Sequence, residues 1–203
     1  MKSDIVITIG RQYGSGGRLI GKAVAEKLGI PFYDKELIDL AAKECGYSPE
    51  FIKANEQRAA FGFLSNLAAQ GFSYSKDTLP PADTLFIAQC KVIQDIAEKG
   101  SCVIVGRCGD YVLRDRADTL HVFIRSEMAP AIKRVTEDYG VREDQAAAEI
   151  KRINKNRAAH CRRYTDRVWG ACENYNMMLD SSILGVDGSA RVILAAVGEA
   201  FAE

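Results

Sequence analysis

The residues with the clearest chemical potential form a glycine-rich loop, Gly14-Ser-Gly-Gly-Arg18, near the start of the chain. A β-branched run precedes the loop, and apolar residues then recur at helical spacing from Leu19 to Leu28. Glycine allows positive φ and close approach, so backbone N–H groups and the positive end of a helix can face an anion. The order of strand, loop and helix favours a phosphate-binding loop over a tight turn with surplus glycine. The phosphate-binding residues that we predict are Gly14, Ser15, Gly16, Gly17, Arg18 and Leu19.

The loop departs from the common P-loop motif, G-x-x-x-x-G-K-[ST]. In an alignment without a gap, Gly17 takes the position of the motif's lysine, and Arg18 and Leu19 take the positions of its hydroxyl residues. A shift of one residue places Arg18 on the lysine and Leu19 on the hydroxyl. Either way, the hydroxyl that contacts Mg²⁺ is missing. Because arginine can bind phosphate bidentately, we expect Arg18 to supply the lost charge.

A second cluster, Gly106-Arg-Cys-Gly-Asp110, directly follows the apolar run Cys102–Val105. An arginine here suits a phosphate group, and an aspartate suits the amino group of a base. A plain turn in which Arg107 and Asp110 pair with each other or with solvent explains the same residues. The sequence leaves both interpretations open.

A third cluster is basic. Between Lys151 and Arg167 there are seven Lys and Arg residues and one acid, a net charge of 7 − 1 = +6. An apolar stripe at Ala146, Ile150 and Ile153 continues onto Arg157. This pattern predicts a helix that leaves the core and closes over a charged cleft, as phosphoryl transfer requires. The alternative is a solvated cationic face.

Other polar residues carry weaker signals. Asp34 and Asp180 each end a predicted strand, where an aspartate could bind Mg²⁺ or a sugar hydroxyl but more often forms a turn or cap. His121 and His160 have no partners nearby in the sequence, so we do not expect them to act as bases. The six cysteines and two histidines show no metal-ligand spacing, and no protein-held metal is predicted.

Composition limits the class of protein. The chain has 203 residues, of which 47% are hydrophobic, and 27 basic residues balance 27 acidic ones. This size suits one domain, and zero net charge argues against a general binder of nucleic acid or membrane surfaces. We see no signal pattern at the N-terminus and no apolar run long enough to span a bilayer. We therefore expect a cytoplasmic protein with reduced thiols.

Predicted strands alternate with helices along the chain, which is typical of an α/β, doubly wound parallel sheet. We expect about five strands, within 5–10, 29–34, 101–105, 120–124 and 177–179. Helices are predicted at 36–45, 83–99, 130–139, 143–163 and 192–201. Residues 49–82 fit a helical insertion, and about 141–167 fit a helical lid. All of this fits a single domain, 1–203.

Several motifs together resemble the cytidylate-kinase-like proteins, a branch of the P-loop nucleoside-monophosphate kinases. They are Gly-Arg-Gln-Tyr-Gly-Ser-Gly-Gly-Arg (10–18), Ile-Pro-Phe-Tyr-Asp (30–34), Cys-Val-Ile-Val-Gly-Arg-Cys-Gly-Asp-Tyr-Val-Leu (102–113), Tyr-Thr-Asp-Arg-Val-Trp-Gly (164–170) and Tyr-Asn-Met-Met-Leu-Asp-Ser-Ser (175–182). The resemblance implies a single P-loop kinase-like domain, 1–203, in which the insertion at 49–82 binds the acceptor. It implies that Asp34, Arg107 and Asp110 contact the monophosphate substrate. It also implies that Arg152 and Arg157 hold phosphates. Cytidylate kinases carry a loop lysine that this chain lacks, and a lid aspartate where Asn154 stands.

We therefore expect an ATP- and Mg²⁺-dependent kinase of a nucleoside monophosphate, most plausibly CMP or dCMP. The catalytic residues that we predict are Arg18, Arg152, Arg157 and Arg163. A kinase of a different small acceptor is one alternative. A nucleotide-binding regulatory or interaction protein with little or no turnover is another. In each case the expected partners are small nucleotides, with neither nucleic acid nor membrane.

Overall fold

The computed structural model describes residues 4–45 and 81–201. Two compact units are present, one formed by 1–34 with 96–203 and the other by 35–95. The predicted insertion, 49–82, lies outside the described residues except for its last two positions.

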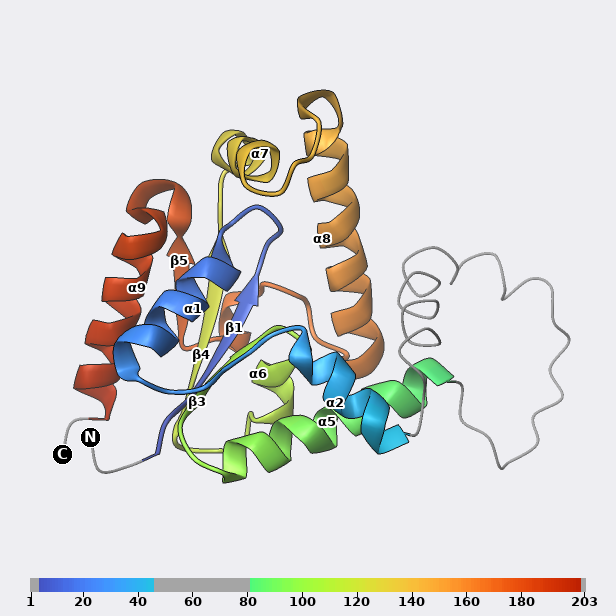
Figure 1. Cartoon of the computed structure of the whole chain (residues 1–203), viewed down its shortest axis with the longest axis vertical. Helices are drawn as coiled ribbons and strands as arrows, with labels where there is room; N and C mark the ends of the chain where they lie inside the picture. Colours follow the sequence, from blue (N-terminus) through green and yellow to red (C-terminus); the bar gives the residue numbers. More distant parts are fainter. Residues whose placement is uncertain (1–3, 46–80, 202–203) are drawn as a thin grey trace, which may run out of the picture. The chain divides into compact units, whose positions relative to one another are not determined.

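The first unit is built on a parallel sheet of five strands in the order β2-β3-β1-β4-β5 (Figure 1). The strands are β1 (Val6–Arg11), β2 (Phe32–Tyr33), β3 (Cys102–Val105), β4 (Thr119–Arg125) and β5 (Met177–Asp180). All four pairings are parallel, and central β1 pairs with both β3 and β4. The predicted α/β parallel sheet is therefore confirmed. Its central strands read as unbroken apolar runs because both of their faces are buried.

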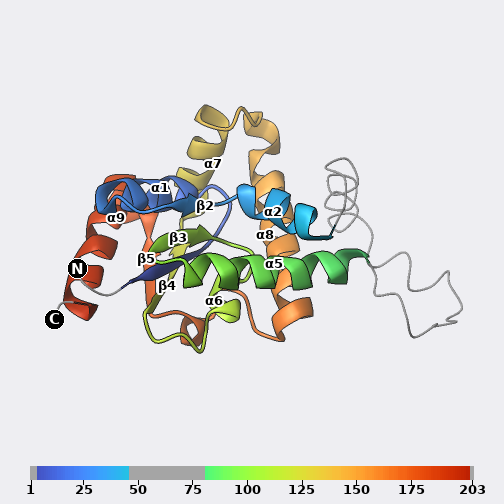
Figure 2. The ribbon, with the colours of Figure 1, turned by 60° about the horizontal axis from the view of Figure 1, so that its bottom comes forward.

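Helices cover both faces of this sheet. Helix α1 (Gly17–Leu28) packs against α9 (Ser181–Ala200) on one face, and the short α6 (Gly109–Val112) lies on the other (Figure 2). A core cluster joins the β1, β3 and β4 side chains to Ile20 and Val24 of α1 and to Ile193 and Val197 of α9. This core fixes the carboxyl ends of the strands, where the loops that follow β1 and β3 begin.

Two further helices stand beyond the carboxyl ends of the strands. Helices α7 (Met128–Glu137) and α8 (Glu143–Thr165) pack on each other through Ala131, Val135, Ala146 and Ile150. The predicted stripe at Ala146 and Ile150 is thus buried. The predicted starts at 130 and 143 agree closely with the structure, because Pro130 is accepted in the first turn of α7.

Helix α9 is the element that the sequence predicted least well, since only 192–201 was expected. It begins at Ser181, with Asp180 as its N-cap, and contains non-helical Gly185 at φ 64°. Glycine weakens a helical signal, which hid the first half of this helix. By length and composition alone α9 could cross a membrane. Its Ile193 and Val197 belong to the sheet core, however, as in the core helix of an α/β domain.

The second unit contains helix α2 (Glu36–Cys45) and most of α5 (Pro81–Glu98), which continues past residue 95 into the first unit. Both helices were predicted. Helix α5 begins at Pro81 instead of after Asp83, since proline is suited to a first turn.

Candidate active site

The glycine loop between β1 and α1 has the backbone that an anion site needs. Gly14 and Gly16 have φ values of +80° and +73°, which L side chains rarely adopt. Gly16 is the N-cap of α1, with no side chain bonded to the cap and no acidic residue in the first turn. The Gly17 N–H donates to the Ser15 hydroxyl oxygen (3.3 Å), and the remaining N–H groups of that turn face the loop together with the positive end of the helix dipole.

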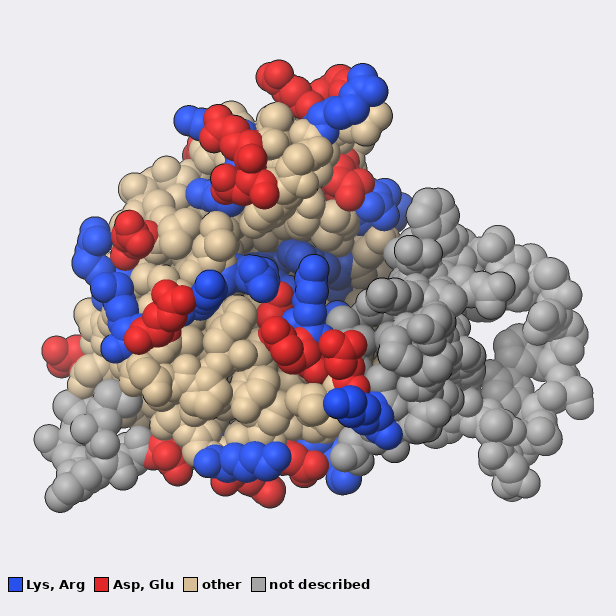
Figure 3. Space-filling model, viewed as in Figure 1, with Lys and Arg blue, Asp and Glu red and all other residues tan. Residues whose placement is uncertain are grey.

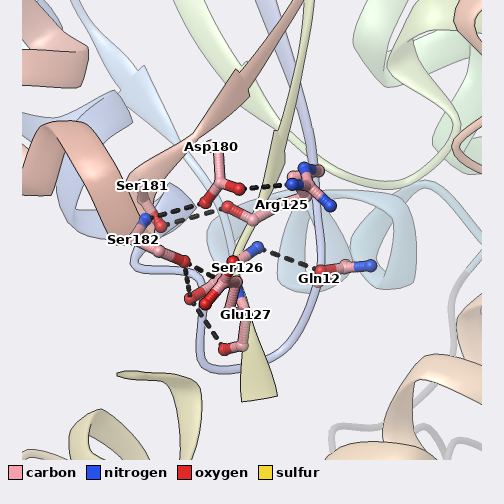
Figure 4. Close-up of polar contacts among 7 residues, drawn as sticks. All are labelled: Gln12, Arg125, Ser126, Glu127, Asp180, Ser181 and Ser182. Atoms are coloured by element: carbon pink, nitrogen blue, oxygen red, sulfur yellow. Dashed lines mark hydrogen bonds and ion pairs between the residues drawn. The ribbon is translucent and has the colours of Figure 1, made fainter. Parts of the chain in front are cut away.

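Hydrogen bonds from several elements fix the shape of this loop. The Ser15 hydroxyl donates to the Gln12 carbonyl (2.8 Å), and the Ser181 hydroxyl donates to the Ser15 carbonyl (2.7 Å). The backbone N–H of Ser126, just after β4, donates to Oε1 of Gln12 (3.0 Å; Figure 4). Arg134 of α7 also donates to the Gly14 carbonyl (2.6 Å). The loop is thus held in one conformation before any ligand binds.

Asp180 belongs to this supporting network. Its carboxylate accepts from the backbone N–H of Ser182 and pairs with Arg125 of β4 (Figure 4). Hydrogen bonding by Ser182, first through its side chain and then through its backbone N–H, is the main cause of the lowered pKa of Asp180. Of the two roles that the sequence left open for Asp180, these contacts favour the helix cap.

Asp34 lies at the end of β2 and is 6% exposed. Nε of Arg18 donates to one of its oxygens at 2.6 Å, and Nη2 of Arg11 donates to the other at 3.4 Å. The guanidinium of Arg18, predicted to face phosphate, therefore lies on Asp34 in this structure. The Asp34 carboxylate thus positions both cations, because charge-assisted hydrogen bonds hold the two guanidinium groups on it.

The turn after β3 is strained. Gly106, Arg107 and Cys108 have successive φ values of +78°, +57° and +54°. Non-glycine residues in this region cost free energy and concentrate at functional sites. Asp110 follows in α6 and is 9% exposed, and burial raises the pKa of its carboxyl group above the ordinary value. The structure thus brings a strained arginine and a buried acid to the edge of the sheet next to the glycine loop.

Helix α8 contacts the glycine loop directly. Oδ1 of Asn154 accepts from the backbone N–H of Tyr13 (2.8 Å), and Nη1 of Arg157 donates to the Arg11 carbonyl (2.8 Å). Burial is the main cause of the lowered pKa of the Arg157 guanidinium. Arg157 therefore lies beside the glycine loop as a partly desolvated cation.

The other two predicted arginines of α8 lie elsewhere. The Arg152 guanidinium is bonded to both carboxylate oxygens of Glu149 within the same helix. Arg163 is exposed, with its guanidinium 5.2 Å from the centre of the Tyr164 ring. Part of the +6 charge is thus balanced on the helix surface by Glu149, which lies outside the counted stretch. Asp166, which is already included in that count, pairs with Arg162. Among the three predicted catalytic arginines of α8, Arg157 is the one whose described hydrogen bond reaches the residue before the loop.

Arg11 is a site residue that the sequence analysis missed. Its side chain is 20% exposed, and burial, followed by the charge of Arg157, lowers its pKa to about 9. The positive charge of Arg107 also lowers the pKa values of Arg11 and Arg157. Figure 3 shows Lys and Arg side chains lining a hollow between the loop after β1 and helix α8. The sequence signal that could have identified Arg11 is its position as the last residue of the first strand, immediately before the loop.

The two histidines are occupied within the fold. Nδ1 of His121 shares a hydrogen bond with the Thr8 hydroxyl (2.7 Å) between neighbouring strands. His160 of α8 stacks edge-on against Tyr164, and burial is the main cause of the lowering of its pKa to about 4. A histidine that is neutral near pH 7 and buried in this way packs as part of the structure.

Comparisons with known proteins agree with this geometry. The model of the cytidylate kinase-like family matches residues 6–183. No curated protein matches the sequence. A crystal structure of an uncharacterized protein from Eubacterium ventriosum is 29% identical, with a TM-score of 0.72 over 95% of this chain and 98% of that one.

More distant structures share the fold. A shikimate kinase from Bacteroides thetaiotaomicron has a TM-score of 0.57 at 14% identity, over 96% of this chain and 99% of its own. A gluconokinase from Sinorhizobium meliloti has a TM-score of 0.57 at 15% identity, over 98% and 94%. Both are P-loop kinases in architecture, so the fold is that of a P-loop kinase. The match over most of its length shows that the chain belongs to the cytidylate kinase-like family.

Proposed function

We propose that this protein transfers the γ-phosphoryl group of ATP to a nucleoside monophosphate, with CMP or dCMP as the preferred acceptor. The observation that carries the proposal is the convergence of three elements on one edge of the sheet. The glycine loop supplies oriented N–H donors, Arg157 reaches that loop from α8, and Arg107 and Asp110 follow β3 beside it. Donor, cations and acceptor residues then share one site, as phosphoryl transfer requires.

Each group has a role that its contacts suit. The loop and the first turn of α1 bind donor phosphates through the backbone, and Arg157 stabilises the charge that spreads over the transferring group. We expect Arg152 and Arg163 to assist when α8 closes further, since exposed arginine side chains can be rearranged at little cost. We expect Arg18 to assist from α1 by holding Asp34. Closure of α8 also excludes water from the site.

The acceptor is held on the other side of the site. Arg107 binds the phosphate group of the monophosphate. Asp34 either binds the sugar of the monophosphate or positions the arginines that bind its phosphate. Asp110 accepts from the exocyclic amino group that cytosine has and uracil lacks. A buried acceptor aimed at an amino group discriminates strongly, because the wrong base leaves it unpaired.

The residues present fit magnesium that arrives with the nucleotide. Within 4–45 and 81–201 no group of three His, Cys, Asp or Glu side chains could hold a metal ion. Leu19 replaces the usual hydroxyl ligand, and Asp34 is the carboxylate beside the loop. Mg²⁺ commonly keeps several waters and binds substrate phosphates with one or two carboxylates. When bound, Mg²⁺ would neutralise part of the phosphate charge. We propose that the protein acts in the cytoplasm, where MgATP is available.

An ADP-release assay across acceptors tests the proposal. The panel pairs CMP, dCMP, UMP and AMP with shikimate and gluconate, the acceptors named by the two structural neighbours. We expect release with nucleoside monophosphates, fastest with CMP or dCMP. Faster release with a hydroxy acid would support a different small acceptor, and ATP binding without release would support a regulatory protein.

A further inference from the structure

One arginine fills a slot built from two glycines. A Cβ atom on Gly17 would lie 2.6 Å from Cβ of Arg11 and 3.1 Å from its Cγ. A Cβ atom on Gly106 would lie only 1.7 Å from Nη1 of Arg11. The Arg11 side chain therefore runs from the end of β1, past the first residue of α1, to the turn after β3. Neither glycine could carry a side chain while Arg11 occupies this path.

Gly17 is a glycine for a different reason from its neighbours. Gly14 and Gly16 need positive φ, whereas the backbone of Gly17 is outside that region and would accept an L residue. What excludes a side chain at Gly17 is the stem of Arg11. In the alignment without a gap, Gly17 is also the residue at the position of the P-loop lysine. The space where a lysine stem would leave the helix is thus taken by the stem of Arg11.

The charges around Arg11 leave it suited to an anion. Its guanidinium shares the Asp34 carboxylate with Arg18, while the nearby Arg157 and Arg107 both oppose its charge. A cation that is poorly solvated and next to like charges is stabilised by a phosphate group. Guanidinium geometry also matches phosphate oxygens in a bidentate fashion.

We propose that Arg11 is the phosphate-binding cation of this loop, in place of the P-loop lysine, and that glycine at position 17 is what admits it. The inference deepens the proposed function and rests on it for the phosphate being that of a nucleotide. Arg18, one residue further into α1, then serves as a positioning residue that holds Asp34 beside Arg11.

A residue exchange tests this proposal. Arg11→Gly removes both the charge and the clashing Cβ atom, and the double variant Arg11→Gly/Gly17→Lys moves the cation onto the helix as in a common P-loop. ATP affinity is measured by calorimetry, and melting temperature reports folding. We expect Arg11→Gly to weaken ATP about 10- to 100-fold, as for a lost charge-assisted hydrogen bond, and the exchange to restore most of it.

Further variants keep the test decisive if glycine at position 11 harms the strand. Arg11→Met keeps the stem without the charge, and we expect the same loss of affinity in a folded protein. Lys22→Ala, an exposed residue of α1 paired with Glu26, is the matched control and should bind ATP normally. Gly17→Lys alone should lower the melting temperature, because its stem meets that of Arg11.

Three results would overturn the inference. They are wild-type affinity in Arg11→Met, no recovery in the exchange variant relative to Arg11→Gly, and a larger loss in Arg18→Ala than in Arg11→Met. The proposed function is judged separately. If Arg11→Met loses affinity for ATP but no acceptor releases ADP from the wild type, this inference stands and the kinase proposal fails. If the wild type releases ADP with an acceptor but Arg11→Met binds ATP with unchanged affinity, the kinase proposal stands and this inference fails.

Discussion

Oδ1 of Asn154, in the middle of α8, accepts a hydrogen bond from the backbone N–H of Tyr13 in the glycine loop at 2.8 Å. One turn further along the same helix, Arg157 donates to the Arg11 carbonyl. The helix expected to act as a lid therefore contributes to the shape of the loop. In this structure one face of α8 is coupled to the glycine loop and the strand end before it, through Tyr13 and Arg11.

The first prediction concerns this coupling. Asn154→Leu keeps a similar volume but leaves the Tyr13 N–H without its acceptor, which should lower the free energy of unfolding by about 1–3 kcal/mol. ATP affinity should fall as well, because the loop is no longer held in shape. Asn154→Asp retains an acceptor oxygen and should be milder. Urea unfolding and ATP calorimetry measure both effects, with exposed Lys155→Ala as the control. Equal results for Asn154→Leu and Lys155→Ala would contradict the coupling.

The second prediction separates two arginines of α8. Arg157→Ala should lower kcat about 10²-fold or more, and ground-state ATP affinity far less, because its charge matters most in the transition state. The loss of its bond to the Arg11 carbonyl should also cost about 1 kcal/mol of stability. Arg152→Ala should have a much smaller effect, since Arg152 is exposed and lies on Glu149. Steady-state kinetics of both variants check this, and similar losses in kcat would argue against a special role for Arg157.

The third prediction concerns the base of the acceptor. If Asp110 accepts from an amino group, Asp110→Asn should weaken a cytosine nucleotide much more than the matching uracil nucleotide. A buried hydrogen bond of this kind is worth about 1–3 kcal/mol, or roughly 5- to 150-fold in affinity. Titrations with CMP and UMP give the ratio directly. Equal losses for the two nucleotides would assign Asp110 a structural role.

The fourth prediction is a pH dependence of stability. Burial lowers the pKa of His160 to about 4, whereas an unfolded histidine has its pKa near 6.5. Between these values the unfolded chain binds more protons than the folded one, so stability rises with pH across this window. His160 should make the protein about 2 kcal/mol less stable at pH 5 than at pH 7.

Urea unfolding of the wild type and His160→Gln at the two pH values isolates this contribution. Burial also lowers the pKa of His121, so both proteins retain some slope of the same sign. The difference between the slopes belongs to His160. Identical slopes would mean that His160 titrates normally in the folded protein.

Much of the fold could be predicted because the signals are local. Runs such as Cys102–Val105 are apolar throughout, which indicates strands buried on both faces, and the parallel sheet follows from their alternation with helices. The start of α9 and the four-residue α6 escaped prediction. Glycines interrupt the first half of α9, and one turn of helix is too short for any periodic pattern.

The location of the candidate site could be predicted from the sequence, but the hydrogen bonds and ion pairs among its residues could not. Glycine spacing identified the loop, and position after β3 identified Arg107 and Asp110 as neighbours of it. Contacts between distant segments cannot be read in the same way. The bond from Asn154 to Tyr13 spans 141 residues, and the path of Arg11 over Gly17 and Gly106 depends on how three elements meet. We expected Arg18 to bind phosphate because a motif comparison considers only neighbours along the sequence. The fold instead places the side chain of Arg11 beside Gly17.

The most direct test of the kinase proposal is to identify the product. The wild-type protein is incubated with Mg²⁺, CMP and ATP labelled in its γ-phosphoryl group, and the nucleotides are separated. The proposed function predicts that the label moves to CDP, that UMP is labelled much more slowly, and that Arg157→Ala suppresses both. Label that stays in ATP, or passes only to water as inorganic phosphate, would contradict phosphoryl transfer to a nucleoside monophosphate.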